Sequence, residues 1–338
     1  MSTYKNLHIA FKNKDDEYYT RYEDIEKELS HYFEFLKDKI VYCNCDDPRL
    51  SNFPRYFIRN FHNIGLKRLI CTGYHKLSVG SFLDVRAEDI PLNSDSLSDA
   101  DLNTLIDSKT GNLFGNGDYA SYECISYLKE SDVVVTNPPF SKFRSFFEYV
   151  VKFNKDFILL APFLALGYNI VLPYVSTGNV KVSSLSKVNN LSFITPNLKS
   201  GSKSFRKIRW LTTLDIKQNT EFILCKYDSA KYPLYDGYTD MINVDHIYEI
   251  PDYKGIMGVP VTYLEHHNSE LFEIVGFAQK HLFINGKQCF VRILIRRRRN
   301  AGDDGAESQI SQNGIMNWED YQIKDLNTDV QTNLSNWV

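Results

Sequence analysis

Apolar residues in this chain fall into two kinds of segment, short continuous runs and longer stripes at helical spacing. Four runs have the length of a buried strand: residues 39–45, 67–73, 132–136 and 156–163. Three stripes at helical spacing lie before or between them: residues 21–36, 51–65 and 141–151. Short strands without polar alternation, separated by helices, are typical of a parallel sheet that is covered on both faces. The pattern therefore predicts an α/β fold with a doubly wound, mostly parallel sheet.

A helix is expected directly after the third strand, beginning at Ser141. Ser141 is a good N-cap, because its hydroxyl can accept a hydrogen bond from a backbone N–H of the first turn. The side of this helix that we expect to be buried carries Phe143, Phe146, Phe147, Val150 and Val151. We expect that side to pack against the sheet.

The remaining segments are less periodic and suggest how the chain is divided. Residues 209–216 and 221–227 are expected to form paired antiparallel strands at the sheet edge, whereas residues 86–114 are polar and predict a loop. Residues 164–208 are rich in serine and weakly periodic, which indicates an insertion. The expected parts are a core at 1–163, an inserted segment at 164–208, the end of the core sheet with an accessory region at 209–299, and a disordered acidic tail at 300–338.

The overall composition excludes several classes of protein. Of 338 residues, 43% are hydrophobic and 24% are charged, which is ordinary for a globular protein. The N-terminal residues lack the apolar region of a secretory leader, and no apolar run approaches the ~18 residues of a membrane span. The six cysteines are scattered, and the C-x-C spacing of Cys43 and Cys45 fits neither a zinc knuckle nor a thioredoxin site. We therefore expect reduced thiols, no metal site, no membrane association and a cytoplasmic location.

The distribution of charge changes what the net charge of −3 implies. Seven acids and one lysine follow Asn300, and without these eight residues the chain carries a net charge of +3. Two long segments, 157–214 and 274–302, contain no acidic residue. The basic residues that we single out in the first are Lys199, Lys203, Arg206, Lys207 and Arg209. Segments without negative charge suit a phosphate-facing surface, so a polyanionic partner is favoured over a merely solvated face.

Candidate chemistry lies where the strands end, because ligands of open parallel sheets bind beyond the carboxyl ends of the strands. Asp46 and Asp47 follow the first strand, and Asn137 follows the third. Acidic side chains at such positions can hold the hydroxyls or the amine of a nucleoside. The sequence has neither G-x-G-x-x-G nor a P-loop, so it lacks the usual phosphate cradles. A ligand with an adenosine and an amino-acid end, such as S-adenosylmethionine, fits better.

Asn137-Pro138-Pro139-Phe140 after a hydrophobic strand resembles the signature of methyltransferases that act on planar exocyclic or amide nitrogens. Further stretches are similar to the EcoRI-type adenine-N6 DNA methyltransferases, in the same order from about residue 15 to 297: DEYYTRYEDIEKEL, VYCNCDDPRLSNFPRYF, GNGDYAS, WLTTLDI and YKGIMGVPVTYL. The similarity is weak in 75–112 and 164–208 and absent after 300. The resemblance implies a class I S-adenosylmethionine-dependent methyltransferase fold, with insertions for DNA target recognition.

The resemblance also implies a cofactor site made from three parts of the chain. Tyr19 and Thr20 would border the methionine end of S-adenosylmethionine. The turn after the first strand, with Asn44, Asp46, Asp47 and Pro48, would replace a glycine-rich F-x-G-x-G motif that is missing here. Gly117, Asp118 and Tyr119 match a Gly-Asp-aromatic element that binds the adenine amine of the cofactor, and Asn137 would contact the cofactor as well.

The four-residue motif has a chemical reason in such an enzyme. Adenine N6 is a poor nucleophile, because its lone pair is delocalised into the ring. Acceptors on its two hydrogens, the Asn137 side-chain oxygen and the Pro138 carbonyl, would pull the nitrogen toward tetrahedral geometry and stabilise its developing positive charge. The prolines, Pro138 and Pro139, fix these directions, and Phe140 can stack on an adenine extruded from the duplex.

The resemblance favours double-stranded DNA as the partner, together with a cognate restriction endonuclease acting on the same site, and a monomer or weak dimer. Lys199, Lys203, Arg206, Lys207 and Arg209 are the candidate DNA-binding residues. Two alternatives stay open: the same motif also serves methylation of ribosomal RNA bases, and a nucleic-acid-binding module can keep the fold without catalysis. The first alternative also includes a protein substrate, because the same motif serves methylation of glutamine in release factors.

Overall fold

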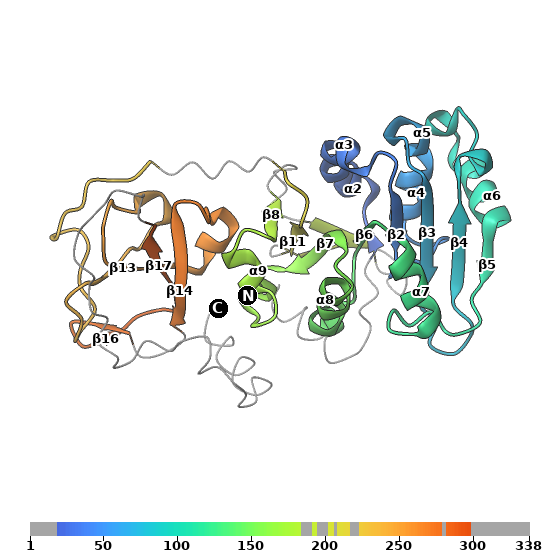
Figure 1. Ribbon diagram of the computed structural model, residues 1–338. Coiled ribbons are helices and arrows are strands. Elements are labelled where there is room, and N and C mark those ends of the chain that lie inside the picture. The colour runs from blue at the N-terminus through green and yellow to red at the C-terminus, as the bar shows by residue number, and fades with distance from the viewer. Residues whose placement is uncertain are drawn as a thin grey trace. The chain divides into compact units, whose positions relative to one another are not determined.

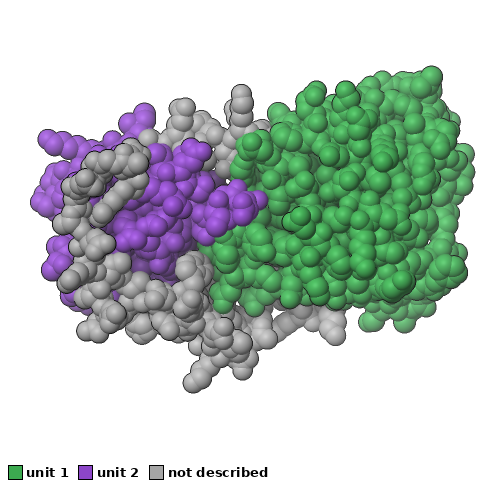
Figure 2. All heavy atoms as spheres, viewed as in Figure 1, with its two compact units in different colours: residues 1–174, 180–218 green, residues 175–179, 219–338 purple. Residues whose placement is uncertain are grey.

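The computed structural model describes residues 19–183, 191–194, 202–205, 208–216, 223–278 and 282–298. Its contacts divide the chain into two compact units (Figure 2), residues 1–174 with 180–218 and residues 175–179 with 219–338. The expected inserted segment at 164–208 falls mostly in unit 1, and the expected tail at 300–338 lies outside the described residues.

Unit 1 is built on an eight-stranded sheet with the order β5-β4-β3-β2-β6-β7-β11-β8 (Figure 1). Its strands are β2 (Ile40–Cys43), β3 (Arg68–Gly73), β4 (Ser81–Val85), β5 (Thr110–Asn112), β6 (Val133–Thr136), β7 (Asp156–Pro162), β8 (Lys181–Ser183) and β11 (Ile208–Thr212). The four central strands, β3-β2-β6-β7, are parallel, and the strands on both flanks are antiparallel. The four parallel strands are the four apolar runs of the sequence, which confirms the mixed α/β class with a parallel central sheet.

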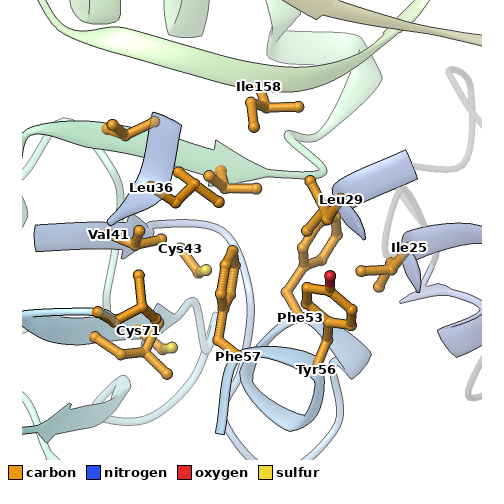
Figure 3. Packing of buried hydrophobic residues seen from close by; sticks show 14 of the residues in the cluster. Ile25, Leu29, Leu36, Val41, Cys43, Phe53, Tyr56, Phe57, Cys71 and Ile158 are labelled. Atoms are coloured by element: carbon orange, nitrogen blue, oxygen red, sulfur yellow. The ribbon is translucent and has the colours of Figure 1, made fainter. Parts of the chain in front are cut away.

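Helices cover both faces of this sheet. They are α2 (Tyr22–Leu29), α3 (Phe33–Leu36), α4 (Asn52–Arg59), α5 (Phe61–Ile64), α6 (Asp99–Lys109), α7 (Tyr122–Glu130), α8 (Phe143–Lys152) and α9 (Leu172–Ser176). On one face, Ile25, Leu29, Phe53 and Phe57 pack with Val41, Cys43 and Cys71 of the strands (Figure 3). On the other face, Tyr42 meets Tyr127 of α7 and Phe157 meets Phe147 of α8. The central strands are thus buried from both sides.

A small second sheet in unit 1 joins distant parts of the sequence. Strand β1 (Tyr19–Thr20) pairs with β9 (Leu191–Ile194), and β9 pairs with β10 (Ser202–Phe205), all antiparallel. Phe193 is in register with Thr20 on one side and with Lys203 on the other. One strand of the expected inserted segment, β9, therefore lies against the short N-terminal strand, and a second, β10, extends the sheet beyond it.

Unit 2 contains a four-stranded sheet with the order β12-β13-β17-β14. Its strands are β12 (Met241–Asn243), β13 (Ile256–Pro260), β14 (Phe272–Ala278) and β17 (Arg292–Arg297), and a separate hairpin is formed by β15 (Phe283–Ile284) and β16 (Lys287–Gln288). Tyr235, Met241, Ile256, Leu282 and Leu294 form a buried cluster beneath it. No helix among the described residues of the chain is long and apolar enough to cross a membrane.

Three expectations about local structure are wrong. Residues 99–109 of the polar stretch form helix α6, whose buried side has only Leu102 and Ile106, too few to give a clear apolar stripe. β11 pairs with β7 and β8, whereas the described part of the expected partner, residues 223–227, has only an isolated bridge from Cys225 to Pro251. Ser141 is not the N-cap of α8.

The cause of the last difference lies in the proline turn. The Pro139 carbonyl accepts from Lys142 N at 2.9 Å, which closes a 3₁₀ turn over Phe140–Lys142. Ser141 lies inside this turn, so helix α8 begins two residues later, at Phe143, and its N-cap is Lys142. The expected buried side of α8 is confirmed for Phe143, Phe146, Phe147 and Val150, while Val151 is half-buried.

Candidate active site

The first and third predicted strands end side by side at the centre of the sheet. The chain runs from β2 to its neighbour β3 on one side and later returns to β6 on the other, so the strand order reverses at β2. Such a switch point is where open α/β sheets bind ligands. Asp46 follows β2 and Asn137 follows β6, and the hydroxyl of Thr136 donates to Asp46 Oδ2 at 2.5 Å. One short hydrogen bond thus joins the two candidate elements.

Asp46 is buried and accepts several hydrogen bonds. Its side chain is 3% exposed, and Ser51, the N-cap of α4, donates its hydroxyl to Oδ1 at 2.6 Å. Burial raises the pKa of Asp46 to about 6, although hydrogen bonds from Ser51, Thr136 and the Asn137 backbone act in the opposite direction. The carboxyl group therefore changes its charge just below neutral pH.

Asp47 is held by its own turn, by the loop after β3 and by the first residue of β4. Its Oδ2 accepts from the Ser81 hydroxyl at 2.6 Å and contacts His75 Nε2 at 2.8 Å, while Oδ1 accepts from Arg49 N at 2.9 Å. His75 was not among the residues predicted from the sequence. It follows β3 by two residues, so the strand-end rule that found Asp46 could have found it.

Close glycine packing brings the Gly117-Asp118 element to the same edge. Gly117 has φ +81°, and a Cβ there would lie 2.2 Å from the Gly73 carbonyl oxygen, at the end of β3. A Cβ on Gly73 would in turn lie 2.7 Å from Asp47 Cα. Backbone bonds from His75 N to Asn116 O and from Gly80 N to Gly115 O, both 2.8 Å, hold the two loops together. Any side chain at Gly117 or Gly73 would force these loops apart.

Asp118 and Tyr119 contact the region of the proline motif. Asp118 Oδ1 accepts from Ala120 N at 2.9 Å, and Lys142 Nζ lies 3.5 Å from Oδ2. The Tyr119 hydroxyl lies 2.7 Å from Ser145 Oγ of α8, and its ring packs edge-on against Phe146. The loop that carries Asp118 is therefore tied to the helix that follows Asn137-Pro138-Pro139-Phe140.

The four motif residues differ in exposure. Asn137 and Pro139 are half-buried, and Pro138 is buried. Phe140 is 5% exposed and belongs to the core cluster on the α4 face of the sheet. In this structure the Phe140 ring is thus mostly covered by protein, and its stacking on a base stays a prediction.

Tyr19 and Thr20 lie beside the turn that carries Asp46. Asn52 Nδ2, at the start of α4, donates to Thr20 O at 2.8 Å, and the preceding residue is Ser51. Two buried oxygens here, Thr20 Oγ1 and Asn44 Oδ1, have no hydrogen-bond partner among the described residues. An unsatisfied buried oxygen costs about 1–3 kcal/mol. Donors on a bound ligand would remove this cost, and the ammonium, hydroxyl and amine groups of S-adenosylmethionine are such donors.

The candidate DNA-binding residues are placed only in part. Arg209 lies on β11, where Ile208 is opposite Pro162, so Arg209 is at the carboxyl-end edge of the sheet. Its guanidinium carbon lies 5.8 Å from the ring centroid of Phe163. Lys203 lies in β10, whereas Lys199, Arg206 and Lys207 lie outside the described residues.

The second acid-free segment is less positive in the fold than in the sequence. Arg292, Arg296 and Arg297 form ion pairs with Asp245, Glu273 and Asp252, respectively. All three acids come from before residue 274. Within the described residues, no group of three or more His, Cys, Asp or Glu is placed to hold a metal ion.

Comparison with known proteins finds a matching family model and several similar proteins. The family model described as "Adenine-specific methyltransferase EcoRI" matches residues 6–327. The Type II methyltransferase M.EcoRI of Escherichia coli is 38% identical over 320 residues, covering 88% of this chain and 98% of that protein. Type II methyltransferase M.MpnI of Mycoplasma pneumoniae is 32% identical, and M.MgeORF184P of Mycoplasma genitalium is 31% identical, each covering 86% of this chain and 98% of the relative. No solved structure matches the chain.

Proposed function

The chain belongs to the family of EcoRI-type adenine-specific methyltransferases, so its activity is site-specific methylation of adenine in DNA, and we propose how the residues at the sheet edge perform it. The proposed reaction transfers a methyl group from S-adenosylmethionine to N6 of an adenine flipped out of the duplex. The bond between Thr136 and Asp46 carries the proposal, because it joins the proline motif to the expected cofactor turn.

The cofactor would lie along the ends of β2 and β3. Thr20 and Asn44 would accept hydrogen bonds at the amino-acid end through their buried oxygens, and Tyr19 would border it. Asp46 and Asp47, followed by Pro48, would hold hydroxyl or amine donors from the turn after β2. Gly117, Asp118 and Tyr119 would enclose the adenine of the cofactor. When bound, S-adenosylmethionine supplies an electrophilic methyl group on a positively charged sulfur.

The catalytic work of the protein is to position and polarise the target amine. The Asn137 side-chain oxygen and the Pro138 carbonyl accept from the two N6 hydrogens and stabilise the positive charge that N6 gains as it forms the new N–C bond. These acceptors would hold N6 so that its lone pair faces the methyl group that the bound cofactor would supply, with the neutral thioether sulfur as leaving group, and one N6 proton would be released to solvent. Pro139 holds the turn through its carbonyl bond to Lys142 N, which limits reorganisation. Phe140 would stack on the extruded base after a rotation of its ring from the core.

Target recognition is proposed for the inserted segment at 164–208. Its strand β9 pairs with β1, next to the proposed cofactor end, and with β10 on the other side, and Arg209 is the second residue of β11 at the carboxyl-end edge of the core sheet. Lys199, Lys203, Arg206, Lys207 and Arg209 would contact phosphates or base edges of double-stranded DNA. The protein would act in the cytoplasm as a monomer or weak dimer, alongside a restriction endonuclease that cuts the same site.

Transfer of labelled methyl groups tests this function. The protein is incubated with labelled S-adenosylmethionine and with unmethylated genomic DNA, cellular RNA or total protein in parallel. We expect label in DNA alone, at N6 of adenine in one sequence context. Label in RNA or protein but not in DNA would contradict the substrate, and DNA binding without any label would indicate a silent binding module.

A further inference from the structure

We propose that Lys142 couples cofactor binding to DNA binding: its ammonium group holds Asp118 until the cofactor takes that carboxylate, and then contacts a DNA phosphate beside the target adenine. The inference rests on the proposed function, because it assumes that Asp118 receives the cofactor and Asn137 the adenine. It gives a role to a residue that the motif itself does not include.

Lys142 is placed between the two halves of the site. Its backbone is fixed as the last residue of the 3₁₀ turn, with its N–H bonded to the Pro139 carbonyl. Its Nζ lies 3.5 Å from Asp118 Oδ2 and 5.8 and 5.9 Å from the ring centroids of Tyr74 and Tyr119. The Lys142 side chain is 52% exposed, so its head group can move through water and leaves behind only the contacts with Asp118 and the two tyrosine rings.

The position of this ammonium conflicts with cofactor binding at Asp118. Asp118 has two carboxylate oxygens, and the backbone of Ala120 already occupies Oδ1. Because Oδ1 has one lone pair engaged by the Ala120 N–H, we take Oδ2, the oxygen that Lys142 now faces, as the acceptor for the adenine amine of the cofactor. A half-exposed ion pair is weak, so displacing it should reduce cofactor affinity by only about two- to fivefold.

A released Lys142 would stand next to the site of base extrusion. Lys142 follows Asn137 by five residues and ends the 3₁₀ turn that comes after the two prolines, and a lysine head on a flexible four-carbon stem is well suited to a phosphate. The nearby basic residue Arg144 has its guanidinium carbon 4.2 Å from the ring centroid of Tyr168, so it is already engaged. Cofactor binding would thus add one positive charge to the DNA-facing side of the motif.

The test uses two variants and one control in the full-length protein. Lys142→Met keeps the stem and removes the charge, Lys142→Arg keeps the charge, and Lys152→Met removes an exposed lysine at the far end of α8. Calorimetry gives the dissociation constant of S-adenosylhomocysteine, the non-reactive product. DNA affinity is then measured over a range of salt concentrations, with and without that ligand, and thermal unfolding checks that each variant is folded.

We expect Lys142→Met to bind S-adenosylhomocysteine about two- to fivefold more tightly than the unaltered protein, because the competitor is gone. In the unaltered protein and in Lys142→Arg, the cofactor product should steepen the salt dependence of DNA binding by about one unit in the log–log slope. In Lys142→Met the cofactor product should leave the salt dependence of DNA binding unchanged. The control variant Lys152→Met should behave like the unaltered protein.

Weaker ligand binding by Lys142→Met would show that Lys142 contacts the cofactor directly and would overturn the inference. An unchanged salt slope in the unaltered protein on adding the ligand would overturn it as well. If the unaltered protein bound no S-adenosylhomocysteine at all, the proposed function itself would fail, and this outcome is distinguishable from the other two.

Discussion

The two units each contain a buried polar network, and the networks differ in how completely they are satisfied. In unit 2, Asn243 is 4% exposed and its side-chain oxygen accepts from the Tyr235 hydroxyl at 2.8 Å and from Arg292 Nε at 3.0 Å. In unit 1, the network of Asp46, Ser51 and Thr136 lies near Thr20 Oγ1 and Asn44 Oδ1, which have no partner among the described residues. A satisfied network stabilises its fold, whereas unsatisfied buried oxygens indicate a place for a ligand. Substitutions in the unit 2 network should therefore lower stability and leave ligand affinity unchanged, whereas substitutions at the unsatisfied oxygens of unit 1 should lower ligand affinity and leave stability unchanged.

The largest expected effect is on the reaction and leaves both networks intact. Asn137→Ala removes a proposed acceptor for the adenine amine, so the rate of methyl transfer should fall by about 10²–10³-fold. Affinity for S-adenosylhomocysteine should change less than about twofold, because the proposed ligand contacts of Asn137 are few. Single-turnover transfer and calorimetry measure the two quantities. Asn137→Asp, which keeps an acceptor, is the matched variant and should retain more activity; equal rates for Asn137→Ala and the unaltered protein would remove Asn137 from the mechanism.

The network of unit 2 should respond in stability alone. Asn243→Ala leaves the Tyr235 hydroxyl and Arg292 without their shared acceptor, which should lower the free energy of unfolding by about 2 kcal/mol. Tyr235→Phe removes a single bond and should cost about 1 kcal/mol. Urea unfolding measures both. A loss of cofactor affinity in either variant, with the protein still folded, would contradict the assignment of this network to structure.

The pH dependence of unit 1 provides a sharper contrast. Burial raises the pKa of Asp46 to about 6 from its ordinary value of 3.8, so the folded state favours the protonated form. The stability that this group contributes is therefore fully present below about pH 4 and is lost as pH rises through about 6. Binding of a cofactor donor needs the ionised form and should go the other way, weakening about tenfold between pH 7 and pH 5. Calorimetry across that range measures both the stability of the protein and its affinity for the cofactor product, with Asp46→Asn as the pH-insensitive control. If stability and affinity changed in the same direction with pH, the proposed role of Asp46 would be refuted.

The smallest effect concerns Asn44 Oδ1, which has no hydrogen-bond partner in the part of the chain that the structure describes. Asn44→Ala should leave the free energy of unfolding unchanged within about 0.5 kcal/mol, or increase it, because a buried unsatisfied oxygen is removed. Affinity for the cofactor should fall about fivefold if that oxygen accepts a ligand hydrogen bond worth about 1 kcal/mol. Urea unfolding and calorimetry of this variant and of Asn243→Ala should show opposite results. Asn44→Ala should lose affinity but not stability, and Asn243→Ala should lose stability but not affinity. A large loss of stability in Asn44→Ala would mean that Asn44 belongs to the structural class.

The sequence was most informative where an element is continuous in the chain. Each parallel strand is a short apolar run, and the rule that ligands bind at carboxyl ends led directly to Asp46 and Asn137. Contacts between distant segments were less accessible. His75 reaches Asp47 only because two loops are joined by backbone bonds around close-packed glycines. Helix α6 has too few apolar residues for its period to be recognised.

Charge was the property most easily misjudged from the sequence. A segment without acids looks exposed and cationic, but Arg292, Arg296 and Arg297 are paired in the fold with acids from other strands and turns. Ion pairs are formed across a sheet, and one-dimensional counting cannot assign them. Position 142 gives the reverse case, where a lysine just after the motif pairs with an acid 24 residues earlier.

The pairing of β1 with β9 has a consequence for how target specificity can diverge. Within the part of the chain that the structure describes, Tyr19 and Thr20 of the N-terminal strand are in register with β9, and the contact is one of backbone strands. Such pairing depends little on which side chains the hairpin carries. Under the proposed roles, β9 and β10 can therefore be exchanged or rewritten while the proposed methyl-donor end stays in place, so that a designer of chimaeras can alter the proposed target-reading segment without rebuilding the proposed catalytic site.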